Sequence, residues 1–130
     1  MSFMSCVRTS YTPKIESNFE GIRISIFQDK ESLYKLAGIY RLHGDIDKNN
    51  EPLLRALVIV IIREEDSKPI SFKLVAYEVF FIEDELLENK YRMGCFNVDL
   101  STSINSLIKG SYFIHVYIIE VKSNIEKLVI

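Results

Sequence analysis

Gly21-Ile22-Arg23-Ile24-Ser25-Ile26-Phe27 decides the fold class, because isoleucine returns at every second position. A repeat of two residues puts alternate side chains on opposite faces of a β-strand. Tyr34–His43 repeats this pattern, with large apolar residues on one parity and mainly basic residues on the other. Both segments therefore predict strands with one buried face.

Five further segments show the same usage of Ile, Val, Phe and Tyr, which is typical of a packed sheet. Leu53–Arg63 is apolar on both parities, which indicates a strand covered on two sides or held in an oligomer. Glu78 interrupts the apolar face of Ile70–Glu83, so we expect a β-bulge at Ala76–Glu78 that turns the glutamate to water. The predicted strands are Gly21–Phe27, Tyr34–His43, Leu53–Arg63, Ile70–Ile82, Arg92–Leu100, Tyr112–Val121 and Ile125–Ile130, with Lys122-Ser123-Asn124 as the last hairpin and Val7–Tyr11 as a candidate eighth strand.

The connecting segments are short and polar, which limits the architecture. Glu83–Lys90 and Ser101–Lys109 have room for one or two helical turns, whereas a parallel α/β sheet needs long helices between its strands. The sequence predicts an all-β fold, an antiparallel β-sandwich of seven to eight strands, as one domain over residues 1–130. Residues 1–19 are an extra edge strand or a covering segment. An α+β fold with helices in the two connectors is the alternative.

Composition narrows the functional classes. The chain has 130 residues, 48% of them hydrophobic, and a net charge of −2, so it carries no excess of positive charge for nucleic acid or an anionic membrane. The longest apolar run, Ala56–Ile62, is shorter than the roughly 18 residues of a membrane helix. No secretory signal opens the sequence, so we expect a cytoplasmic protein, with a mature exported fragment as the alternative. Two cysteines predict reduced thiols.

Leu107-Ile108-Lys109-Gly110-Ser111-Tyr112 precedes the predicted strand Tyr112–Val121. It resembles the tyrosine corner of immunoglobulin-like and fibronectin-III-like Greek-key sandwiches. The resemblance implies a sharp turn at Gly110 and an inward Tyr112 ring whose hydroxyl bonds to backbone a few residues upstream. It also implies that the seven strands correspond to A, B, C, an edge strand after C, E, F and G. The absence of tryptophan departs from antibody-type domains, and function does not transfer from the fold.

The strand Tyr112–Val121 also predicts an interaction surface. If Tyr112 and every second residue after it point inward, the opposite parity faces outward. Large residues in a row on an outer face usually mark a protein partner or a second copy. We therefore expect a non-enzymatic interaction or structural module, homodimeric through this sheet; the alternative is that another segment of the chain covers the row. The predicted contact residues are Phe113, His115, Tyr117 and Ile119.

The segment 44–51 supplies a second functional hypothesis. Asp45, Asp47 and Asn49 place oxygen-bearing side chains at alternate positions, as in calcium loops. Asn50 stands where such loops have glycine, and Ala56 where they have a bidentate glutamate. A solvated turn is therefore favoured, and a small-ligand, carbohydrate or calcium-dependent binding domain is the alternative function.

An enzyme is not expected. His43 and His115 are the only histidines, and no nucleophile motif accompanies either. Cys95 pairs with Cys6 only if the N-terminal segment docks beside its strand. No glycine-rich phosphate loop or metal-ligand spacing is present, so we expect no cofactor.

Overall fold

A computed structural model describes residues 9–16, 18–43, 56–64, 72–81, 85–87, 91–100, 109–118 and 120–130. The secondary structure of these residues consists of strands, without a helix. None of the described segments is a helix of the length and apolarity needed to cross a membrane. The strands are β1 (Gly21–Gln28), β2 (Tyr34–His43), β3 (Ala56–Glu64), β4 (Phe72–Phe81), β5 (Glu85–Leu87), β6 (Tyr91–Asp99), β7 (Ser111–Ile118), β8 (Val121–Lys122) and β9 (Glu126–Val129).

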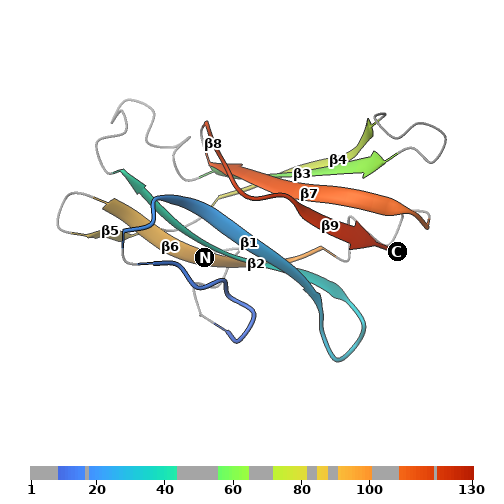
Figure 1. Ribbon diagram of the computed structural model, residues 1–130, viewed down its shortest axis with the longest axis horizontal. Coiled ribbons are helices and arrows are strands. Elements are labelled where there is room, and N and C mark those ends of the chain that lie inside the picture. Colours follow the sequence, from blue (N-terminus) through green and yellow to red (C-terminus); the bar gives the residue numbers. More distant parts are fainter. Residues whose placement is uncertain are drawn as a thin grey trace.

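The strands form two antiparallel sheets, which lie as two layers in Figure 1. The first sheet has the order β1-β2-β6-β5. The second sheet has the order β4-β3-β7-β8, and β9 pairs with β7 beyond β8. Strands therefore occur in all seven predicted ranges, and the prediction of an all-β antiparallel fold is confirmed for the described residues.

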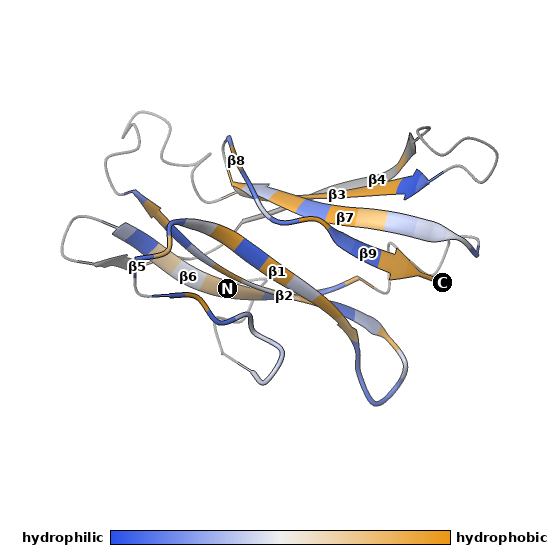
Figure 2. Ribbon diagram, viewed as in Figure 1, coloured by the Kyte–Doolittle hydropathy of each residue, from blue (hydrophilic) through white to orange (hydrophobic). Residues whose placement is uncertain are grey.

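The inner faces of the two sheets form one hydrophobic core, because alternate residues of each strand point to it. Figure 2 shows this alternation of hydrophobic and hydrophilic residues along β1. The predicted inward parities of β1, β2, β6 and β7 are confirmed by burial. The largest fully buried side chains include Tyr40, Tyr112, Phe96, Leu36, Leu57, Ile59, Ile61, Ile114 and Ile118.

Two glycines make room for aromatic rings in the first sheet. Gly38 lies opposite Phe96 and Gly94 lies opposite Tyr40 in the β2–β6 ladder. A Cβ atom at Gly38 would overlap the Phe96 ring, and one at Gly94 would overlap the Tyr40 ring. The rings thus occupy the space that a cross-strand side chain would fill, which places both rings in the core.

Two local expectations are corrected here. Glu85–Leu87 forms β5 instead of a helical turn, because its backbone extends the ladder of β6; residues 101–108 lie outside the described part. The bulge skips Val75, since Ile61 pairs with Ala76 and Ile62 with Leu74, and it leaves position 78 in regular register opposite Ile59. It therefore lies one residue before the predicted range.

The last hairpin also differs from the prediction. β7 ends at Ile118, and Lys122 already belongs to β8, which pairs back onto β7. Ser123 and Asn124 connect β8 to β9 instead of forming the hairpin turn, because their side chains bond to neighbouring backbone. The Ser123 hydroxyl accepts a hydrogen bond from the Val116 amide, and the Asn124 side chain bonds to both backbone groups of Ile24 in the first sheet.

The N-terminal segment lies on the outer face of β1. Residues 9–16 form a turn followed by irregular chain, without a strand, whereas Val7 lies outside the described residues. The Tyr11 ring stacks on Phe27 with centroids 3.9 Å apart, and the Ser25 hydroxyl donates to the Tyr11 carbonyl. Ser25 and Phe27 belong to the outward parity of β1, so this segment covers part of the first sheet.

Candidate functional site

The outer face of the second sheet is formed by residues that share cross-strand rows. One row joins Val79, Val58 and Tyr117, from β4 to β7. A second row joins Leu74 and Ile62 to Phe113, and Val60 pairs with His115 between the two rows. Directly paired residues of antiparallel strands project from the same face of the sheet. Two further residues belong to this face, because Ile125 borders Phe113 and Val129 pairs with Ser111. The term outer face is used below for Val58, Val60, Ile62, Leu74, Val79, Phe113, His115, Tyr117, Ile125 and Val129.

Exposed apolar side chains concentrate on this outer face. Among the described residues, five large hydrophobic side chains are exposed, and four of them are Leu74 at 58%, Val79 at 46%, Ile125 at 52% and Val129 at 65%. The fifth is Tyr11, which belongs to the segment stacked on the first sheet. Single exposed apolar residues are ordinary, whereas a concentration of them on one face is typical of contact surfaces.

The predicted contact row is only partly exposed. Phe113 and Tyr117 are half-buried on the outer face, and His115 is 6% exposed. The expectation that His115 faces solvent is therefore wrong, because the Tyr117 ring packs against it edge-on at 5.1 Å and Phe113 and Lys122 adjoin it. Ile119 lies outside the described residues. Sequence reasoning missed Leu74, Val79, Ile125 and Val129. Alternation gives no clear signal for the last two, because Lys127 lies between them on the same parity.

A hollow opens beside His115, where the strand next to β7 is interrupted. β8 pairs with Tyr117 and Ile118, and β9 pairs with residues 111–114, so neither places a strand residue opposite His115. Ser123 crosses this gap by bonding to the Val116 backbone, and Asn124 turns toward the first sheet. The hollow measures about 300 Å³ and is lined by Ile62, Phe113, His115, Lys122 and Ile125.

The electrostatics of the hollow are set by one lysine and one imidazole. Burial, and to a lesser extent the positive charge of Lys122, holds the pKa of His115 below its usual value. His115 is therefore neutral at pH 7. Its Nδ1 atom has no hydrogen-bond partner in the described part of the chain. Lys127 lies near the same margin, with its Nζ 5.9 Å from the centre of the Phe113 ring.

The residues of the tyrosine-corner motif lie at the start of β7. Tyr112 is fully buried, and Gly110 has φ of +158°. The Gly110 backbone exchanges two hydrogen bonds with Ile130, which extends the pairing of β7 with β9. Leu107 lies outside the described residues.

The other predicted chemistry is not assembled in the described residues. Asp45, Asp47 and Asn49 lie outside them, as does Cys6. Cys95 is buried and forms no disulfide bond with a described residue. His43 belongs to the first sheet and meets Tyr91, whereas His115 belongs to the second, so the histidines share no cleft. Where the chain is described, no three His, Cys, Asp or Glu residues are grouped to hold a metal ion.

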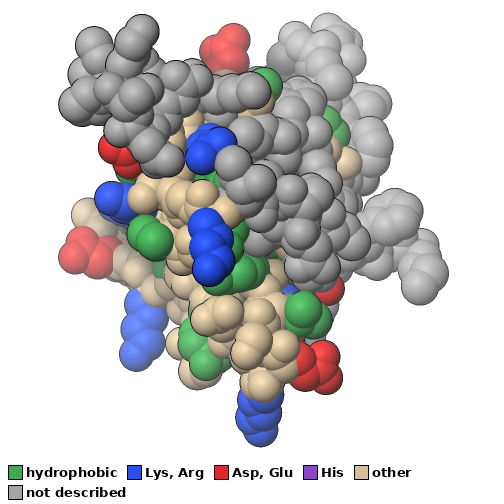
Figure 3. Space-filling view, turned by 90° about the vertical axis from the view of Figure 1, so that its right-hand side faces the viewer, with side chains coloured by type: hydrophobic (Ala, Val, Ile, Leu, Met, Phe, Trp, Pro, Cys, Tyr) green, Lys and Arg blue, Asp and Glu red, His purple; other side chains and the backbone are tan. Residues whose placement is uncertain are grey.

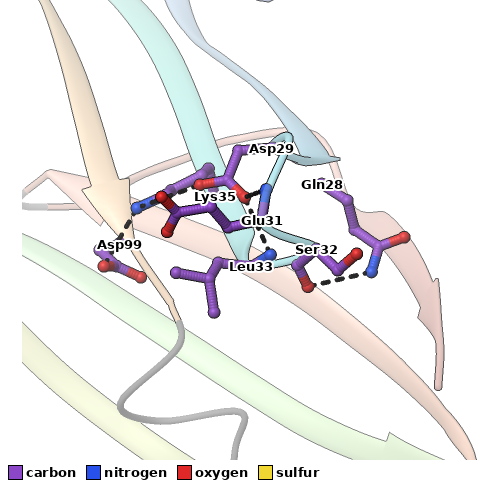
Figure 4. A network of polar contacts seen from close by, with 7 residues as sticks. All are labelled: Gln28, Asp29, Glu31, Ser32, Leu33, Lys35 and Asp99. Carbon is purple, nitrogen blue, oxygen red and sulfur yellow. Dashed lines mark hydrogen bonds and ion pairs between the residues drawn. The ribbon is translucent and has the colours of Figure 1, made fainter.

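A network of polar contacts around Asp29 and Lys35 has a structural role (Figure 4). Asp29 accepts hydrogen bonds from the Glu31 and Leu33 amides and so closes the β1–β2 turn. Lys35 contacts Asp99 at 3.0 Å and Asp29 at 3.8 Å, which joins this turn to the end of β6. In the end-on view of Figure 3, hydrophobic side chains are scattered among charged ones. The described part of this end therefore resembles ordinary solvated surface.

Comparison with known proteins assigns no family: no protein-family model, curated protein or solved structure matches this chain. The functional class therefore rests on the outer face of the second sheet and on the hollow beside His115.

Proposed function

We propose that the protein is a non-enzymatic interaction module, a β-sandwich of immunoglobulin-like Greek-key connectivity, which self-associates through the outer face of the second sheet. The strand neighbours support the fold assignment. With β1, β2, β6 and β5 as A, B, E and D, the first sheet has the order A-B-E-D. The second sheet likewise has β4 at one edge, then β3 and β7 as C and F, with β9 as G.

One observation carries the functional proposal. Four of the five exposed large apolar side chains in the described residues belong to one face of one sheet. They continue the half-buried residues Val58, Ile62 and Tyr117 on the neighbouring strands. Removing such a face from water is favourable by about 25 cal/mol per Å² of apolar surface.

A second copy of the chain suits this face for two reasons. The central residues are apolar, so the face is complementary to itself, as a twofold interface requires. The charged side chains Lys122 and Lys127 lie at the β8–β9 margin, away from β4. A twofold axis parallel to the strands places this margin over β4 of the other copy, which keeps the lysines of the two copies apart.

The experiment is a measurement of mass against concentration by sedimentation equilibrium. The wild-type chain should form dimers, and Val79→Glu and Leu74→Glu should each weaken the association by at least about tenfold, because each buries a charge. Both positions lie at the exposed β4 edge, so the variants should keep the wild-type circular dichroism spectrum.

Tyr11→Glu is the matched control, since Tyr11 is equally exposed but lies on the first sheet. It should leave the dimerisation constant within about twofold of wild type. A chain that is monomeric at millimolar concentration, or a Tyr11→Glu variant as weakened as Val79→Glu, would overturn the proposal.

A further inference from the structure

The hollow beside His115 has the construction of a ligand site, which is a function distinct from self-association, although four of its lining residues also belong to the outer face. Its volume of about 300 Å³ is at the lower end of the range for small-molecule pockets. It exists because Ser123-Asn124-Ile125 leaves the ladder between β8 and β9. The departure is fixed by the hydrogen bonds of Ser123 to Val116 and of Asn124 to Ile24, so the hollow is a built feature of the fold.

Three of the residues that line the hollow are apolar. Ile62 comes from β3, Phe113 from β7, and Ile125 from the connection between β8 and β9. Ile125 is 52% exposed, so a ligand would remove additional apolar surface from water on binding. A compact aromatic or branched aliphatic body matches such walls.

The polar groups of the hollow select the charge of its ligand. Among the described residues that line the hollow, Lys122 is the one charged residue and none is a carboxylate. His115 is more than nine-tenths buried, and its Nδ1 has no hydrogen-bond partner among the described residues. This Nδ1 atom is itself enclosed by protein, so the imidazole meets a ligand through the atoms that line the hollow. A carboxylate both accepts hydrogen bonds and attracts the lysine ammonium group.

We propose that this hollow binds a small monocarboxylate with an apolar body, its carboxylate between Lys122 and His115 and its body against Phe113 and Ile125. The ligand class is defined by this chemistry: one negative charge at one end, and an aromatic or branched aliphatic group at the other.

The test is a titration with 4-methylbenzoate, followed by amide and imidazole NMR shifts, with the neutral 4-methylbenzamide as the paired probe. The carboxylate should bind saturably with a dissociation constant of about 1 mM or below. The amide should bind at least about fivefold more weakly, because it lacks the charge that Lys122 attracts. The largest shifts should be those of Phe113, His115 and Ile125.

Lys122→Gln should remove the preference for the carboxylate and leave the affinity for the amide unchanged. Lys127→Gln is the control, because Lys127 is near Phe113 but does not line the hollow; it should keep at least half of the preference. The titration is repeated on Val79→Glu, so that dimerisation does not cover the hollow and failure of the dimer proposal leaves this test intact.

Equal affinity for the two probes, saturation without shifts at His115, or absence of saturable binding in both wild type and Val79→Glu would overturn the proposal. Retention of the full carboxylate preference in Lys122→Gln would overturn it as well.

Discussion

The two sheets share one core, but the residues on their outer faces differ in how far they are exposed to solvent. On the outer face of the first sheet, Ala37, Ile39 and Cys95 are 0%, 2% and 5% exposed. On the outer face of the second sheet, Leu74 and Val79 are about half exposed or more. Both faces are apolar at their centre, so residue type alone does not separate a covered face from an open one.

The margins of the two faces differ as well. Around the first sheet, Arg41 lies over the Tyr91 ring at 4.1 Å, and Lys35 pairs with Asp99. Such contacts pair cationic groups within the chain. At the margin of the second sheet, Lys122 forms no ion pair within the described residues. The second sheet therefore exposes both apolar surface and positive charge in its described part.

Truncation of one isoleucine on each outer face should give the largest effect and tests whether the two faces differ in burial. Ile39→Ala should lower the free energy of unfolding by about 3 kcal/mol, because the side chain is fully enclosed and a cavity remains. Ile62→Ala should cost about 1 kcal/mol, since Ile62 is half-buried beside the hollow. Urea unfolding followed by circular dichroism measures both losses, at a protein concentration low enough for monomers. Equal losses would contradict the difference between the faces.

The inner face of the first sheet offers the next largest effect. Gly38→Ala should lower the free energy of unfolding by about 2 kcal/mol, because the added methyl group overlaps the Phe96 ring. Phe96→Leu in the same chain should recover part of this loss, since the smaller side chain leaves room for the methyl group. Urea unfolding of the two single variants and the double variant gives the coupling between the positions. Strictly additive losses would show that the ring is not the source of the strain.

The sequence predicts the strands but not which residues of their outer faces are buried and which are exposed. Alternation in Gly21–Phe27 is a local property, and the structure has a strand there with Ile22 and Ile24 buried. The hollow beside His115 depends on the gap between β8 and β9, which is held in part by hydrogen bonds between residues about 100 positions apart, Ile24 and Asn124. Leu74 reaches the outer face because the bulge at Val75 changes its parity relative to Ala76. Such long-range contacts and one-residue shifts leave no clear periodic signal.

A smaller effect is expected where the two sheets are joined. The Asn124 side chain accepts a hydrogen bond from the Ile24 amide at 2.8 Å and donates to its carbonyl at 3.1 Å. Asn124→Ala should lower the free energy of unfolding by about 1.5 kcal/mol and accelerate amide exchange at Ile24. Asn124→Asp keeps the acceptor but loses the donor, so its loss should be intermediate. Unchanged exchange at Ile24 in Asn124→Ala would contradict this role.

The smallest expected effect concerns His115 and depends on pH. Burial first, and the charge of Lys122 second, lowers the pKa of His115 in the folded protein. Between that lowered pKa and the ordinary value of about 6.5 in the unfolded chain, the unfolded chain binds more protons. The free energy of unfolding should therefore fall as the pH falls through this window, and the contribution should vanish above about pH 7.5, where both states are neutral.

His115→Gln should remove this part of the pH dependence, and Lys122→Gln should reduce it without removing it, because burial remains the larger cause. Urea unfolding at several values between about pH 5 and about pH 8 gives the slope for each variant. The difference between wild type and His115→Gln isolates the histidine from the carboxylates that titrate below it. A slope that His115→Gln leaves unchanged would mean that the imidazole accepts a proton in the hollow as readily as in water. The hollow would then be wetter than its apolar walls imply, and the second sheet would lose the desolvated polar group that distinguishes its outer face.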